Sequence, residues 1–136
     1  MKIFLLLLLL FINSLQFAFA NLKMDIAFVN KKGIDKGLVL VNELHSTEEF
    51  LGLTPVVLTM KDNLRLEVYA HMVPDYGVYG PSSLAWVNAK IYGHNGILLK
   101  DFSASPLLIS LGKTKKFIFE REELGQIVEV IFTPYF

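Results

Sequence analysis

The stretch LRLEVYAHM, residues 64–72, decides the fold class of this chain. Apolar side chains stand at every second position, and the positions between them hold Arg65, Glu67, Tyr69 and His71. Successive side chains of a β-strand point to opposite sides of the sheet, so a repeat of two residues marks a strand with one buried face. We therefore predict a half-buried strand here, with the four polar residues on its exposed face.

The same pattern, in shorter or weaker form, extends along the chain on both sides. Short apolar segments are separated by turn residues such as Gly, Pro, Asn and Asp. The segments that we predict as strands are 22–29, 37–44, 55–60, 64–72, 85–92, 97–102, 107–111, 116–121 and 127–133. About seven to nine short strands with almost no helix are typical of an all-β fold. We predict an antiparallel β-sandwich, Ig-like or similar, with a small closed barrel as the alternative.

Three local predictions concern the ends of these strands. Residues 45–53 favour a helical turn, because Ser46 followed by Glu49 matches a capping box. The pair Asn95-Gly96 predicts a tight hairpin turn of type I′, since both residues tolerate positive φ. Pro134 has no backbone N–H and is expected to interrupt the last strand.

The first twenty residues have a different character. A lysine precedes an apolar run at residues 3–12, and Ala18 and Ala20 place small side chains at the end of the segment. This order predicts a secretory signal peptide at residues 1–20, cleaved after Ala20. The apolar run is too short to span a membrane, and an uncleaved anchor is the alternative. We expect residues 21–136 to form one β-sandwich domain with no membrane span.

The composition excludes several classes of function. The chain has thirteen Lys and Arg, thirteen Asp and Glu, and no Cys. Balanced charge argues against a nucleic-acid partner, which would call for an excess of Lys and Arg. The absence of Cys excludes a disulfide scaffold, a thiol nucleophile and a cysteine-linked lipid anchor. An exported chain without disulfides favours the bacterial periplasm, with full secretion as the alternative.

Motifs of catalysis are missing from the sequence. It contains no G-x-S-x-G, H-E-x-x-H, P-loop or G-x-G-x-x-G pattern. His45, His71 and His94 fall in three different segments, without the spacing of metal ligands. We therefore expect no catalytic residue, no metal site and no cofactor. The rival hypothesis is a small hydrolase or metal-dependent enzyme that uses His71 and Glu67.

Aromatic side chains mark the first candidate for a binding surface. Residues 73–83 form the longest predicted loop, which carries Tyr76 and Tyr79 and ends near Trp86. Tyr and Trp provide rigid contact area at low entropic cost, so we predict these three residues as contact anchors. The alternative is that their rings cap the core. The second candidate for binding is the strand face of Arg65, Glu67, Tyr69 and His71.

One short segment resembles a known family. The sequence SPLLI at residues 105–109, followed by Gly112-Lys113 and by FIFE at residues 117–120, is similar to a strand-turn-strand pattern of bacterial secretin channel proteins. The resemblance covers residues 105–120 and carries over no functional residue. The resemblance implies an association with the cell envelope or with a secretion system.

Together these observations predict an exported, non-enzymatic β-sandwich that binds protein partners in the cell envelope. We expect an accessory or structural subunit of an envelope assembly, for example a secretion system. The alternatives are the small periplasmic enzyme and a soluble ligand-binding protein.

Overall fold

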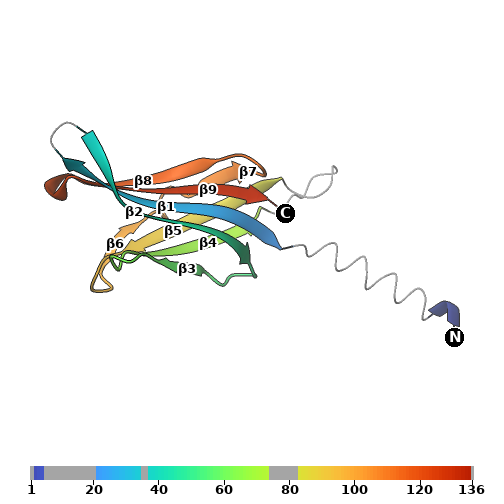
Figure 1. The fold of residues 1–136 in the computed structure, drawn as a ribbon. Helices are drawn as coiled ribbons and strands as arrows, with labels where there is room; N and C mark the ends of the chain where they lie inside the picture. The colour runs from blue at the N-terminus through green and yellow to red at the C-terminus, as the bar shows by residue number, and fades with distance from the viewer. Residues whose placement is uncertain (1, 5–20, 35–36, 74–82, 136) are drawn as a thin grey trace.

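The computed structural model describes residues 2–4, 21–34, 37–73 and 83–135. Apart from a helical turn at residues 2–4, these ranges are almost entirely β-structure, with nine strands and one short 3-10 helix (Figure 1). The strands form two antiparallel sheets whose apolar faces pack on each other. The predicted all-β sandwich is confirmed.

Sheet A has the strand order β2-β1-β9-β8. Its strands are β1 (Leu22–Ile34), β2 (Gly37–Phe50), β8 (Lys115–Arg121) and β9 (Gln126–Tyr135). The 3-10 helix η1 (Glu122–Leu124) joins β8 to β9, and Gly125 after it adopts a left-handed φ of 59°. β2 and β8 are therefore the two edges of this sheet.

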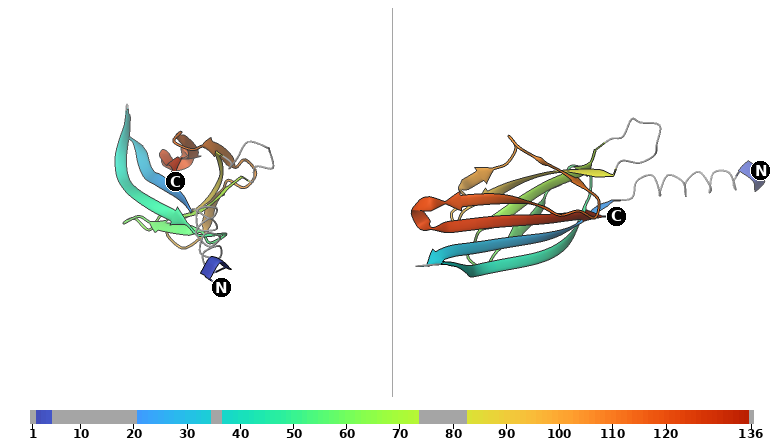
Figure 2. Two further views of the ribbon diagram at one scale, coloured as in Figure 1. Left: turned by 90° about the vertical axis from the view of Figure 1, so that its right-hand side faces the viewer. Right: turned by 90° about the horizontal axis from the view of Figure 1, so that it is seen from above.

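Sheet B has the strand order β3-β4-β5-β6, and β7 also pairs with β5. Its strands are β3 (Val56–Thr59), β4 (Arg65–Met72), β5 (Leu84–Tyr92), β6 (Leu98–Asp101) and β7 (Leu107–Ser110). β4 occupies one side of β5, so β6 and β7 lie one after the other along its opposite side. The two views in Figure 2 show how the two sheets lie against each other.

The core lies between the sheets and takes every second side chain of the central strands. Its fully buried members include Met24, Ile26, Phe28, Leu66, Val68, Val87, Ile91, Val128, Val130 and Phe132. Phe117 of β8 stacks on Phe102, which follows β6, with 4.1 Å between the ring centroids. Phe117 also meets the ring of Phe132 edge-on at 5.8 Å. This aromatic cluster joins sheet A to sheet B.

The helical turn predicted for residues 45–53 is wrong, because β2 remains a strand as far as Phe50. The reason is the long partner strand β1, which pairs with β2 along its whole length. Side chains support this pairing, since Thr47 Oγ1 donates a 2.8 Å hydrogen bond to Asp25 Oδ1 across the ladder. Ser46 Oγ bonds to Glu48 at 2.5 Å, and no capping box forms.

The last strand continues through Pro134 to Tyr135, so the predicted interruption at Pro134 is wrong. Pro134 lies opposite Met24 of β1, and its carbonyl accepts a 2.7 Å hydrogen bond from the N–H of Gly112. The N and O of one strand residue point to the same side, so the missing N–H faces Gly112 rather than β1. The ladder between β1 and β9 therefore loses no bond at the proline.

The turn at Asn95-Gly96 joins two strands as predicted, but its type differs. Gly96 has a φ of 73°, whereas Asn95 does not adopt positive φ. The N–H of Gly96 donates to the carbonyl of Gly93 at 3.0 Å, and the N–H of Gly93 donates to Ile97 at 2.8 Å. This is the longer hairpin loop with one left-handed glycine, rather than a two-residue type I′ turn.

The predicted signal peptide lies mostly outside the described residues, which include only residues 2–4 of it. Within the described ranges, no helix has the length and the apolar character needed to cross a membrane. The segment that resembles the secretin pattern forms β7 and β8, which belong to different sheets. It is therefore a crossover between the two layers and not a hairpin.

Candidate functional site

The outer face of sheet B carries the polar side chains that alternate with the core. β4 contributes Arg65, Glu67, Tyr69 and His71, and β5 contributes Trp86, Asn88, Lys90 and Tyr92. The antiparallel register places these residues opposite each other in four pairs: Arg65 with Tyr92, Glu67 with Lys90, Tyr69 with Asn88, and His71 with Trp86. The face is thus a sequence of cross-strand pairs, the arrangement that most directly stabilises a sheet surface.

Rings and cations occupy most of this surface. The imidazole of His71 stacks on the indole of Trp86, with 4.9 Å between the ring centroids and 19° between the planes. The guanidinium of Arg65 lies 4.4 Å from the ring centroid of Tyr92. Lys90 Nζ lies 5.5 Å from the ring centroid of Tyr69. Cations at these distances are attracted to the ring faces, so the side chains hold one another in place.

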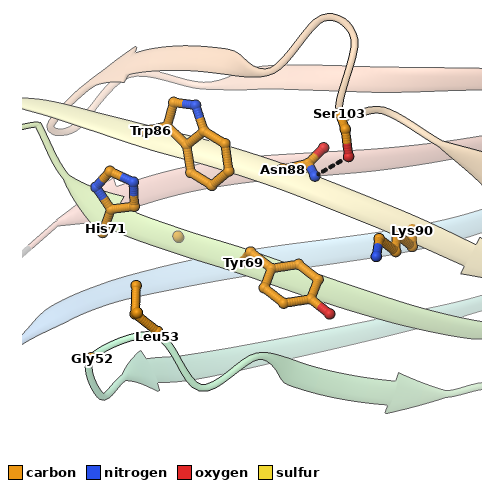
Figure 3. A pocket seen from close by; sticks show the side chains of 9 residues that line it. Gly52, Leu53, Tyr69, His71, Trp86, Asn88, Lys90 and Ser103 are labelled. Atoms are coloured by element: carbon orange, nitrogen blue, oxygen red, sulfur yellow. Dashed lines mark hydrogen bonds between the residues drawn. The ribbon is translucent and has the colours of Figure 1, made fainter.

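A hollow of about 350 Å³ opens on this face, and Figure 3 shows the side chains that line it. Its floor is formed by β4 and β5, with Tyr69 and Trp86 among the lining residues. The loop between β2 and β3 supplies Leu53 to the lining, and the segment after β6 supplies Ser103. Leu53 is 88% exposed. We call this feature the outer-face hollow.

Asn88 is the buried polar residue of the outer-face hollow, with only 5% of its surface exposed. Its Nδ2 donates a 2.9 Å hydrogen bond to Ser103 Oγ. Ser103 in turn donates to Asp101 through both its hydroxyl and its backbone N–H. These bonds hold the pKa of the Asp101 carboxyl below its usual range. Asn88 Oδ1 is buried and receives no hydrogen bond from any described residue.

Tyr69 is fixed as a neutral hydroxyl. It donates a hydrogen bond to the carboxylate of Glu67. This bond, with a further contribution from burial, raises the pKa of Tyr69 to about 12. Tyr69 therefore stays protonated at neutral pH and cannot act as a base there.

The proton-transfer pair that the enzyme hypothesis needs is not assembled. His71 Nδ1 lies 3.1 Å from the carbonyl of Met72, and the Glu67 carboxylate is bonded to Tyr69. Among the residues that the structure describes, no three His, Asp or Glu side chains gather as metal ligands.

The structure brings together five of the seven predicted contact residues. Trp86 lies on β5 and joins the strand face on β4 that was the second candidate. Tyr76 and Tyr79 lie outside the described residues. Four lining residues were not predicted from the sequence: Leu53, Asn88, Lys90 and Ser103. The alternation of residues 85–92 was visible, but the pairing of that strand with β4 was not.

No protein-family model matches the chain, and comparisons with curated proteins and with solved structures find no match.

Proposed function

We propose that this chain is a non-enzymatic binding protein of the cell envelope, and that the outer face of sheet B is its recognition surface. The observation that supports this most directly is the stacked pair of His71 and Trp86 beside the outer-face hollow. Aromatic side chains around a shallow hollow are the usual anchors of protein contacts. The exposed Leu53 at the hollow adds apolar area that a partner would cover.

The chemistry of the hollow indicates what part of a partner it would receive. Its volume suits one large side chain, which would lie against Trp86 and Leu53. Lys90 adds a positive charge at the same hollow, so the contact would favour an acidic or carbonyl group nearby.

The compartment and the kind of assembly are part of the same proposal. The signal-peptide pattern at residues 1–20 supports export, and the lack of Cys suits the periplasm, with full secretion as the alternative. A small exported domain whose main surface feature is an aromatic contact face fits an accessory or structural subunit. The partner would then be another envelope protein.

The test uses tagged full-length protein produced at native level in cells, with chemical crosslinking before the envelope fraction is purified. Mass spectrometry then compares the unaltered chain with Leu53→Asp and with the control Leu124→Asp. Leu124 is also exposed but lies on η1, at sheet A. We expect a defined set of partners that Leu53→Asp loses and Leu124→Asp retains. Recovery of the same partners with Leu53→Asp, or of the free chain only, would overturn the proposal.

A further inference from the structure

β2 is an edge strand that is apolar on both of its faces at residues 38–41. Leu38, Val39, Leu40 and Val41 are each between 47% and 55% exposed. β1 pairs with β2 on one side, and in the described residues no strand pairs with it on the other. An exposed apolar edge of this kind is a template for pairing with another chain.

The edges of sheet B are protected in a way that soluble proteins commonly use. β3, β6 and β7 have four residues each, and short edge strands offer little to pair with. β8, the second edge of sheet A, carries Lys115, Lys116, Glu120 and Arg121, so a strand that pairs with it needs matching charges. Residues 37–42 of β2 include neither a charge nor a proline, although a register shift against β1 occurs near Val41. β2 is thus the least protected edge.

β8, at the opposite edge of sheet A, has the complementary pattern. Ile118 on its outer face is 45% exposed, and Lys116 lies two residues before it on the same face. β2 shows the reverse order, with apolar residues first and Glu43 after them. Two antiparallel strands with these orders would place Lys116 beside Glu43. Ile118 would then lie beside Leu40, because β2 has one extra residue, Val41, between Leu40 and Glu43.

The geometry of β2 accommodates this pairing. Against β1, Glu43 lies opposite Val29 and Leu40 lies opposite Lys31, so three residues of β2 span the length of two on its partner. The extra residue is Val41. A second strand that follows the same spacing pairs Lys116 with Glu43 and Ile118 with Leu40, as required.

We propose that the free edge of β2 binds the free edge of β8 in a second copy of this chain, which continues sheet A from one molecule into the next. The two surfaces are different, so the contact is heterologous, and each molecule retains one free β2 and one free β8. Copies would therefore assemble into open chains. This contact lies on sheet A and is independent of the recognition surface on sheet B.

Other groups near the contact are compatible with it. Lys116 Nζ lies 3.5 Å from Glu129 Oε1 in the same molecule, and Glu129 also binds Lys31, so this carboxylate keeps a cation if Lys116 turns toward a second copy. Lys115 Nζ donates to the carbonyl of Leu108 in the same molecule, and the proposed contact does not require this bond to break. His45 lies 3.5 Å from Glu43 and adds a second partner for that carboxylate.

The test measures molar mass against concentration by light scattering, on protein purified from the envelope fraction of cells that produce the full chain. The variants are Leu40→Lys, Glu43→Lys and Lys116→Glu, with Lys61→Glu, in the exposed turn between β3 and β4, as the control. Circular dichroism confirms that each is folded. We expect concentration-dependent oligomers of the unaltered chain and of the control. Leu40→Lys should associate at least roughly tenfold more weakly than the unaltered chain.

Mixing the variants Glu43→Lys and Lys116→Glu tests whether β2 of one copy contacts β8 of the next. Glu43→Lys and Lys116→Glu should each associate weakly alone, and an equal mixture should regain the oligomers because opposite charges face each other again. A monomer at all concentrations would overturn the proposal. Oligomers that persist in all three variants, or a mixture without recovery, would also overturn it, since another surface would then hold the copies together.

Discussion

The imidazole of His71 lies stacked on the indole of Trp86, 4.9 Å away between ring centroids. The two residues are direct cross-strand neighbours, and their positions follow from the inner faces of β4 and β5. Val68 and Ala70 pair with Ala89 and Val87 in the core. This register determines which side chains of β4 and β5 lie opposite each other on the outer face of sheet B. The recognition surface that we propose is thus positioned by the core.

The emission of Trp86 should report this stack, because it is the only tryptophan in the chain. We expect His71→Ala to shift the emission spectrum, since the indole gains contact with solvent. The free energy of unfolding should fall by only about 0.2–1 kcal/mol, the range of a cross-strand pair. The matched control is His45→Ala, on β2 of sheet A, which should leave the spectrum unchanged. An unchanged spectrum in His71→Ala would contradict the stacking.

The hydroxyl of Tyr69 should titrate late. Its pKa is raised to about 12, above the ordinary value of 10.0, first by the hydrogen bond to Glu67 and then by burial. The raised pKa means that this contribution to stability is present below pH 10 and is lost as the pH rises through about 12. Subtracting the absorbance titration curve of Tyr69→Phe from that of the unaltered chain isolates the titration of the Tyr69 hydroxyl. We expect Glu67→Gln to bring the midpoint closer to 10.0, and no shift would contradict the bond.

Glu129 should make stability depend on acid pH. Its pKa is lowered from 4.5, chiefly by the hydrogen bond from Lys31, with Lys116 adding to the effect and burial opposing it. The contribution is therefore present above pH 4.5 and is lost as the pH falls through the lower folded value. We expect Glu129→Gln to cost about 1 kcal/mol at pH 7 and progressively less below pH 4.5.

Urea unfolding at a series of pH values measures this difference. The control is Glu120→Gln on the neighbouring strand, where no ion pair with another described residue exists. The control should change stability little at any pH. A difference for Glu129→Gln that stays constant down to pH 3 would show that the carboxylate charge is not responsible.

The aromatic cluster should carry a large share of the contact between the sheets. Phe132 is fully buried and meets Phe117, which stacks on Phe102 of sheet B. Phe132→Ala should lower the free energy of unfolding by about 3–5 kcal/mol through lost burial and a cavity. Leu124→Ala, at an exposed position, should change it by less than about 0.5 kcal/mol. Equal effects of the two would mean that the cluster is not packed.

The sequence predicted the strands whose side chains alternate strictly and whose ends carry turn residues. β4 and β5 are examples, and they supply most of the candidate site. It failed where a partner strand decided the outcome: residues 45–50 follow β1 despite a local capping pattern, and Pro134 is tolerated because its nitrogen faces away from β1. The outer-face hollow could not be predicted from the sequence, because Leu53 and Ser103 come to line it only through the pairing of strands that are distant in the sequence.

The central claim is that a partner contacts the outer-face hollow, and site-specific photo-crosslinking from position 53 in living cells tests it most directly. A photoreactive amino acid replaces Leu53 in one strain and Leu124 in another, and both are irradiated at native expression level. We expect one discrete protein adduct from position 53, its loss when Trp86→Ala is added, and no such adduct from position 124. The same adducts from both positions, or an adduct from position 53 that survives Trp86→Ala in a folded protein, would contradict the account.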